Sequence, residues 1–134
     1  MENMNNEIVE ICTLNRDLYK CISEDINTDR VVLTNKSLLH MIDHHPEVLC
    51  EVLEELKSTM LCPDYIIRDD SHPDSGLVIK KVRSNDKYHV FIVLRVCTDS
   101  KNGALANSII SGWKISDKRL HSYLRNKTVL YRRV

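Results

Sequence analysis

The segment Lys87–Cys97, KYHVFIVLRVC, carries the strongest pattern in the chain and decides how the rest is interpreted. Successive side chains of a β-strand point to opposite faces of a sheet, so alternate residues share a face. One face would consist of Tyr88, Val90, Ile92, Leu94 and Val96, and the other of His89, Phe91, Val93, Arg95 and Cys97. We therefore predict a strand whose first face is buried under helices and whose second face is open.

Working outward from this strand, β-branched and apolar runs bounded by turn residues predict further strands. They lie at Val31–Leu33, Tyr65–Ile67, Leu77–Val82, Ser108–Ile115 and Val129–Tyr131, and Ile8–Leu14 fits either a strand or a short helix.

Helix signals precede most of these strands. Thr34-Asn35 offers an N-cap for a helix that ends near His44, because Pro46 disfavours helical backbone at the residue before it. Pro46 suits the first turn of a second helix, whose apolar residues recur at helical spacing to about Leu61. Asp117 is expected to cap a short final helix. The predicted fold class is α+β, with N-terminal helices on one face of an antiparallel sheet of about four strands and a short C-terminal helix.

Size and composition fit one globular domain spanning residues 1–134. The chain is 43% hydrophobic and 28% charged, and only three Gly and three Pro are present, which excludes low-complexity linkers. Five widely spaced cysteines without a C-x-x-C pair are not a disulfide framework or a zinc ribbon. With no signal peptide and no membrane span visible, we expect a cytoplasmic protein that has no membrane partner.

The charges balance overall but are unevenly distributed. The 19 basic and 19 acidic residues argue against a general nucleic-acid-coating role, although one local basic groove stays compatible with them. Acids gather at Glu47, Glu51, Glu54 and Glu55, whereas Arg119, Arg125, Lys127, Arg132 and Arg133 have no acid after Asp117. The sequence predicts an acidic helix and a basic end.

Three of the six histidines, His40, His44 and His45, fall within six residues. A histidine pair could supply the base and the acid of RNA cleavage, and His45 at a helix N-cap would be held neutral by the helix dipole. His40 and His44 also have the spacing of a metalloprotease helix, but Met41 stands where that motif has Glu, so no metal or other cofactor is expected. The remaining alternative is that these histidines are structural, which is common on helices.

The open face of the central strand is the second candidate feature. By alternation Lys80 would point outward, together with Phe91 and Arg95, which could bind a phosphate and stack a base. The alternative is a solvated charged face. Trp113 is more typical of a core than of a ligand platform, and Ser111 lacks a nucleophile-elbow sequence.

These residues together resemble a known family. The stretches Val31–Thr34, Leu39–Pro46, Cys62–Asp64, Val78–Val82, Val90–Val96 and Ile109–Trp113 are similar in pattern and order to the phage-associated nucleases of the barnase–EndoU–colicin–RelE superfamily. The similarity covers roughly residues 31–115. It implies helices followed by a four-stranded antiparallel sheet, as found in phages, mobile elements and polymorphic toxins.

The resemblance also implies roles for individual residues. His40 and His45 match the helix histidines, Lys80 or Lys81 the strand base, Arg95 a later strand base, and Ser111 a hydroxyl that is usually Thr. Trp113 replaces the usual Tyr, and His44 stands where the family more often has Arg.

The expected function is metal-independent RNA endonuclease activity by attack of the 2′-hydroxyl. The catalytic residues would be His40, His45, Lys80, Lys81 and Ser111, and Arg95, Phe91 and Trp113 would bind the substrate. Expected partners are RNA, with tRNA as one candidate, and a cognate inhibitor or immunity protein. Two alternatives stay open: a catalytically inactive module that binds protein or RNA, and a metal-dependent hydrolase built on the histidine cluster.

Overall fold

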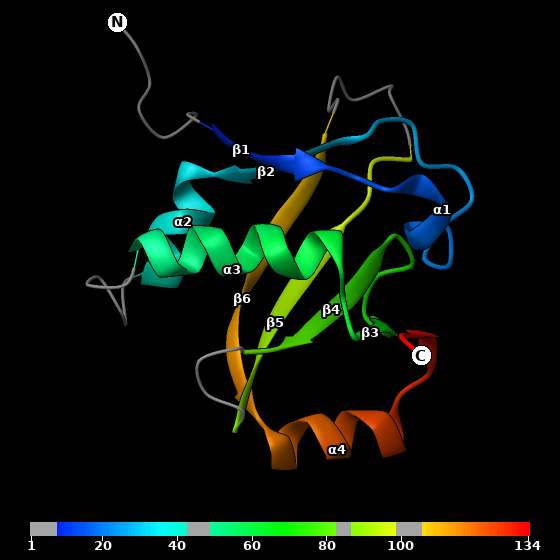
Figure 1. Ribbon diagram of the computed structural model, residues 1–134. Coiled ribbons are helices and arrows are strands. Elements are labelled where there is room, and N and C mark those ends of the chain that lie inside the picture. The colour runs from blue at the N-terminus through cyan, green and yellow to red at the C-terminus, as the bar shows by residue number, and fades with distance from the viewer. Residues whose placement is uncertain (1–7, 43–48, 83–86, 99–105) are drawn as a thin grey trace, which may run out of the picture.

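Seven strands form one mixed sheet, with helices packed against both of its faces (Figure 1). The computed structural model describes residues 8–42, 49–82, 87–98 and 106–134. In chain order the elements are β1 (Ile8–Thr13), α1 (Arg16–Tyr19), β2 (Arg30–Thr34), α2 (Asn35–Ile42), α3 (Leu49–Leu61), β3 (Tyr65–Arg68), β4 (Ser75–Lys81), β5 (Tyr88–Arg95), β6 (Asn107–Ser116), α4 (Asp117–Asn126) and β7 (Val129–Arg132).

The strands lie in the order β1-β2-β6-β5-β4-β3-β7. All neighbours are antiparallel except β2 and β6, which run parallel with Val31 opposite Asn107. The long strands β4, β5 and β6 form the middle of the sheet, and β1 and β7 are its two edges.

The predicted sheet of about four antiparallel strands was wrong, because the sheet is mixed and has seven strands. Val31, Val32 and Leu33 of β2 are at most 3% exposed, so β2 is buried on both faces between β1 and β6. A strand buried on both faces shows no alternation from which its place could be inferred. At the other edge, β7 pairs with β3.

The prediction that N-terminal helices cover one face was also wrong. β1 precedes every described helix, and the two faces are covered by different helices. Leu56 and Met60 of α3 belong to a core with Val78 of β4, Val82 just after β4, and Val90, Ile92 and Leu94 of β5. On the opposite face, Leu120 of α4 packs with Ile67, Leu77 and Ile79. The adjacent residues Val78 and Ile79 therefore belong to different cores, as alternation requires.

Most individual elements were predicted correctly. The central strand is present as β5, and its residues Val90, Ile92 and Leu94 are at most 1% exposed. Tyr88 was expected to be buried but is 42% exposed, because it begins the strand at one end of the sheet. The N-cap of α4 is Ser116, whose side chain accepts the backbone N–H of Arg119 at 3.2 Å, so Asp117 is the first helical residue rather than the cap.

Candidate functional site

His40 does not lie beside Lys80 and Lys81, the lysines that were predicted to share its site. It is exposed in the last turn of α2, and it lines neither of the two hollows that contain Lys80 and Lys81. His44 and His45 lie outside the described residues. The described part of the chain therefore offers no histidine pair on this helix, and the assignment of His45 as the base stays a prediction.

Lys80 and Arg95 lie on opposite faces of the sheet, which corrects the prediction that they share an open one. Lys80 is the cross-strand partner of Val90, and partners in an antiparallel pair share a face. That face is the one under α3, where Lys80 Nζ donates to Ser58 Oγ at 3.1 Å. Arg95 is exposed farther along β5, opposite Ser75.

The face that was expected to be open is covered by α4. Phe91 stacks on Tyr123 of α4, with the ring centroids 5.6 Å apart, so its ring packs inside the protein. Trp113 is half-buried against the core under α3, and Lys114 Nζ lies 4.8 Å from the centroid of its ring. Ser111 is half-buried opposite Val93 in the middle of the sheet. The structure therefore does not bring Phe91, Trp113 and Ser111 to the hollow that holds Lys80.

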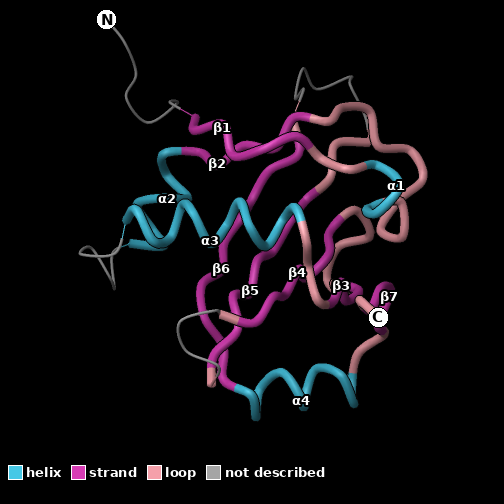
Figure 2. Tube along the Cα trace, viewed as in Figure 1, coloured by secondary structure: helices cyan, strands magenta, loops and turns pink. Residues whose placement is uncertain are grey.

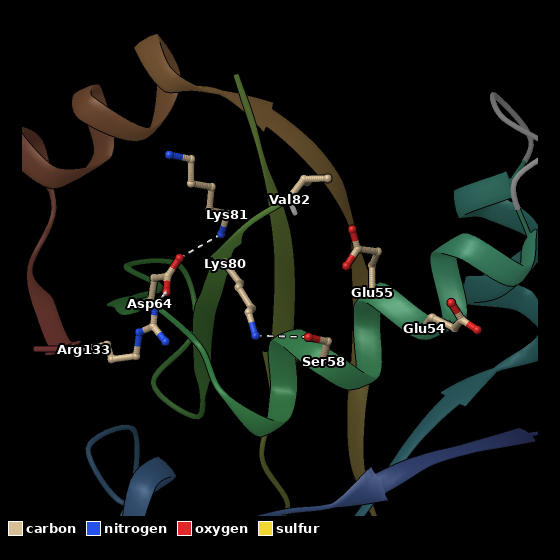
Figure 3. A pocket seen from close by; sticks show the side chains of 8 residues that line it. All are labelled: Glu54, Glu55, Ser58, Asp64, Lys80, Lys81, Val82 and Arg133. Carbon is tan, nitrogen blue, oxygen red and sulfur yellow. Dashed lines mark hydrogen bonds and ion pairs between the residues drawn. The ribbon is translucent and has the colours of Figure 1, made fainter. Parts of the chain in front are cut away.

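The lysines instead line a hollow of about 490 Å³, called here the lysine hollow (Figure 3). It is lined by Glu54, Glu55, Ser58, Asp64, Lys80, Lys81, Val82 and Arg133. In Figure 3, Lys80 points to Ser58 on α3, whereas Lys81 extends toward α4. The volume lies within the range of small-molecule sites, roughly 300–1,000 Å³.

Asp64 holds three segments together beside this hollow. Its Oδ2 accepts the backbone N–H of Lys81 at 2.8 Å, and its Oδ1 lies 3.0 Å from Arg133 Nη2. Backbone hydrogen bonds join Asp64 N to Ile79 O and Arg133 N to Asp64 O. The C-terminal Arg133 is thus fixed next to the end of β4, far from it in sequence.

A second hollow, the histidine hollow, adjoins the first and has a volume of about 390 Å³. It shares Asp64, Lys81 and Arg133 with the lysine hollow and adds Tyr65, His89, Asp117, Leu120, His121 and Val134. The cations Lys81 and Arg133 therefore line both hollows, with Glu54 and Glu55 on one side of them and His89, Asp117 and His121 on the other.

His89 and Asp117 are joined by a hydrogen bond in the histidine hollow, with Nε2 and Oδ1 2.5 Å apart. The His89 side chain is 8% exposed, and its Nδ1 is buried with no hydrogen-bond partner among the described residues. Because Nε2 faces Asp117 and Nδ1 is out of reach, His89 anchors the start of α4 to β5 and does not face a ligand. His121, on the same hollow, is exposed.

The hydrogen bond from His89 lowers the pKa of Asp117, and the charges of His121 and Lys81 act in the same direction. A carboxylate whose folded pKa is below its unfolded value stabilises the fold above the unfolded pKa, about 3.9, and loses that effect as the pH falls through the folded value.

Replacing Asp117 by Asn should therefore lower the free energy of unfolding at about pH 6–7, where carboxyl groups are ionised. The difference in this free energy between the variant and the parent should shrink as the pH falls below the unfolded pKa of the carboxyl group. Urea unfolding across this pH range measures it. Asp25→Asn, at an exposed loop carboxylate, is the control and should leave the pH profile unchanged. A constant gap between Asp117→Asn and the parent at all pH values would contradict this role.

The sequence pointed to Lys80 and Lys81 but not to Glu55, Arg133, His121, His89 or Asp117 as members of one site. The signal that could have found Arg133 was the run of cations without acids at the C-terminal end. The signal for His89 was its place between apolar residues on β5, where a histidine needs a partner.

Within residues 8–42, 49–82, 87–98 and 106–134, no three His, Cys, Asp or Glu side chains gather as a metal-binding group. None of the helices in this part of the chain combines the length and apolar content that a membrane crossing requires.

Comparisons of the chain with protein-family models, with curated proteins and with solved structures found no match. The similarity to the barnase–EndoU–colicin–RelE superfamily stays a prediction based on the residues quoted for it.

Proposed function

We propose that this chain binds RNA across the lysine and histidine hollows and cleaves it without a metal ion. The observation that carries the proposal is that Lys80 and Lys81, the two lysines singled out in the sequence, line the same hollow as Glu55 and Arg133. Metal-independent RNA cleavage needs a base, an acid and charge stabilisation at the phosphorus, and a carboxylate, a histidine and cations can supply them.

Glu55 takes the proton of the 2′-hydroxyl, and the oxygen attacks the neighbouring phosphorus. Lys81 and Arg133, which line both hollows, offset the negative charge that builds up on the phosphorane. The bond from phosphorus to the 5′-oxygen breaks, and the imidazolium of His121 protonates that oxygen. The products are a 2′,3′-cyclic phosphate and a 5′-hydroxyl. In this assignment Glu55 takes the role of base that was predicted for His45, and His121 is the acid that the pair His40 and His45 was expected to include.

The first test is incubation of the purified protein with RNA, tRNA included, in EDTA. Cleavage with a 2′,3′-cyclic phosphate end is the expected result. Glu55→Gln should slow cleavage about 10²–10⁴-fold, because it removes the base while keeping the size of the side chain. Lys81→Met should slow it about 10²–10³-fold, because it removes one stabilising charge.

Matched controls separate these effects from general loss of charge. Glu24→Gln and Lys20→Met change exposed side chains outside both hollows and should cut at the parent rate. His40→Gln should also cut at the parent rate. If His40→Gln abolishes cleavage while Glu55→Gln does not, the helix histidines implied by the resemblance carry the acid–base chemistry and the hollow is not the site.

A second candidate function is RNA binding without cleavage. It is favoured by the positions of His40, Arg95 and Ser111, none of which lines the lysine hollow. Retention of RNA with no cleavage under any condition would select this function. Cleavage that appears only with added divalent metal would reject both.

A further inference from the structure

The exposed side of α4 carries three cations, Lys118, Arg119 and Arg125. None of the three is paired with an acid in the described ranges. α4 packs on the face of the sheet opposite α3, and in Figure 2 it lies apart from α1, α2 and α3. Its exposed positions are charged or polar, with no apolar residue that would enter a lipid surface.

A third hollow, the α4 hollow, lies on this helix and has a volume of about 430 Å³. It is lined by Ser116, Lys118, Arg119, Ser122 and Tyr123. Two cations, two hydroxyls and an aromatic ring are therefore gathered around one space. A phosphate would bind the cations and hydroxyls, and a base would stack on the ring of Tyr123 in place of Lys127, whose Nζ lies 5.8 Å from the ring centroid.

Both serines have a proton to donate into this hollow. Ser116 Oγ already accepts the N–H of Arg119 at 3.2 Å, and Ser122 Oγ accepts from Asn126 Nδ2 at 3.3 Å. Each oxygen therefore has one bond as an acceptor and keeps its O–H for another partner. Phosphate oxygens only accept hydrogen bonds, so they suit these donors.

The helix that carries the hollow is firmly held. Leu120 is 4% exposed in the core under α4, Tyr123 stacks on Phe91, and His89 binds Asp117. Lys81 and Asp117 line the histidine hollow. The first turns of α4 contribute residues both to the histidine hollow and to the α4 hollow. One helix therefore carries both hollows, with Asp117 and His121 on one side of it and Lys118, Arg119 and Ser122 on the other.

We infer that the α4 hollow binds a nucleotide of a single-stranded RNA whose reacting phosphate lies between Lys81 and Arg133. The inference rests on the proposed function and names its preferred substrate class: a single strand several nucleotides long, which reaches the α4 hollow, rather than a dinucleotide, which fills only the cleavage site, or a duplex. A duplex keeps its bases stacked on one another, so it has no free base for Tyr123.

The test uses Lys118→Ala with Arg119→Ala in the full chain. Binding of a labelled single-stranded oligoribonucleotide, followed by fluorescence anisotropy, should weaken about 10-fold or more, because two charged contacts are lost. The slope of log K against log salt should fall by about 1.4, since each phosphate contact on a single strand contributes about 0.7. Lys20→Ala with Lys36→Ala removes two exposed cations elsewhere and should change neither quantity.

The rates at which a dinucleotide and a longer strand are cleaved separate this inference from the proposed function. The Lys118→Ala, Arg119→Ala variant should cut a dinucleotide at the parent rate and the longer strand more slowly. Equal effects on both substrates, or parent-like binding of the strand, would overturn the inference while cleavage by the parent still stands. If the parent cleaves nothing, anisotropy still tests the α4 hollow. Competition by duplex RNA as strong as by the single strand, or binding of phosphatidylserine vesicles instead of RNA, would overturn it too.

Discussion

Gly112→Ala is expected to lower the free energy of unfolding by about 2–6 kcal/mol, the sum of backbone strain and steric overlap. Gly112 lies in β6 with φ +147, a conformation that residues with a Cβ rarely adopt. A Cβ built there would lie 2.0 Å from Phe91 O and 2.9 Å from Ile92 Cα. Both atoms belong to the backbone of β5, so they cannot move without opening the pairing of β5 with β6 at the centre of the sheet.

Gly76→Ala is the matched control in strand β4, on the other side of β5. A Cβ there would lie 2.5 Å from Ile22 Cδ1, which is the far end of a flexible side chain and can turn aside. Its cost should be smaller, about 1–3 kcal/mol. Urea unfolding followed by circular dichroism measures both variants. A Gly112→Ala protein as stable as Gly76→Ala would show that β6 can relax around the added methyl group.

The positions of the strands could be predicted from the sequence, apart from β1, which fitted either a strand or a short helix, but their pairing could not. Alternation identified β5 and its buried residues Val90, Ile92 and Leu94 correctly. It gave no register between β4 and β5, and the pairing of Lys80 with Val90 puts Lys80 under α3, on the face opposite to the one expected. A register error of one residue exchanges the two faces of a strand, so local pattern cannot decide this point.

The candidate site shows the same limit over longer distances. Arg133 reaches the lysine hollow only because β7 pairs with β3, which brings it to within 3.0 Å of Asp64. Nothing near either residue in the sequence encodes that pairing. His89 was assigned to an open face because the sequence did not show that α4 folds back over the sheet. The lysines were found because two adjacent cations at the end of an apolar strand are conspicuous, although the reason given for Lys80 was wrong.

Asn107→Ala is expected to cost about 3–5 kcal/mol in the free energy of unfolding, because it leaves three backbone groups without their side-chain partner. Asn107 is fully buried at the start of β6. Its Nδ2 donates to Thr28 O at 2.9 Å and to Arg30 O at 3.0 Å, and its Oδ1 accepts the N–H of Cys97 at 2.8 Å. One side chain at the start of β6 therefore links the beginning of β2 and the residues before it to the segment that follows β5.

Asn107→Asp tests which part of the amide matters, because it has nearly the same shape. The carboxylate still accepts from Cys97, but it has no proton for the two carbonyl oxygens and buries a charge without a partner. The measurement is made at pH 8, which is roughly four units above the pKa of a carboxyl group in the unfolded chain. At this pH Asn107→Asp should be at least as destabilising as Asn107→Ala. Asn126→Ala, at an exposed amide at the end of α4, should stay within about 0.5 kcal/mol of the parent. If Asn107→Ala were as mild as Asn126→Ala, the three backbone groups would have found other partners, and the side chain would not be what holds the parallel strand pair in place.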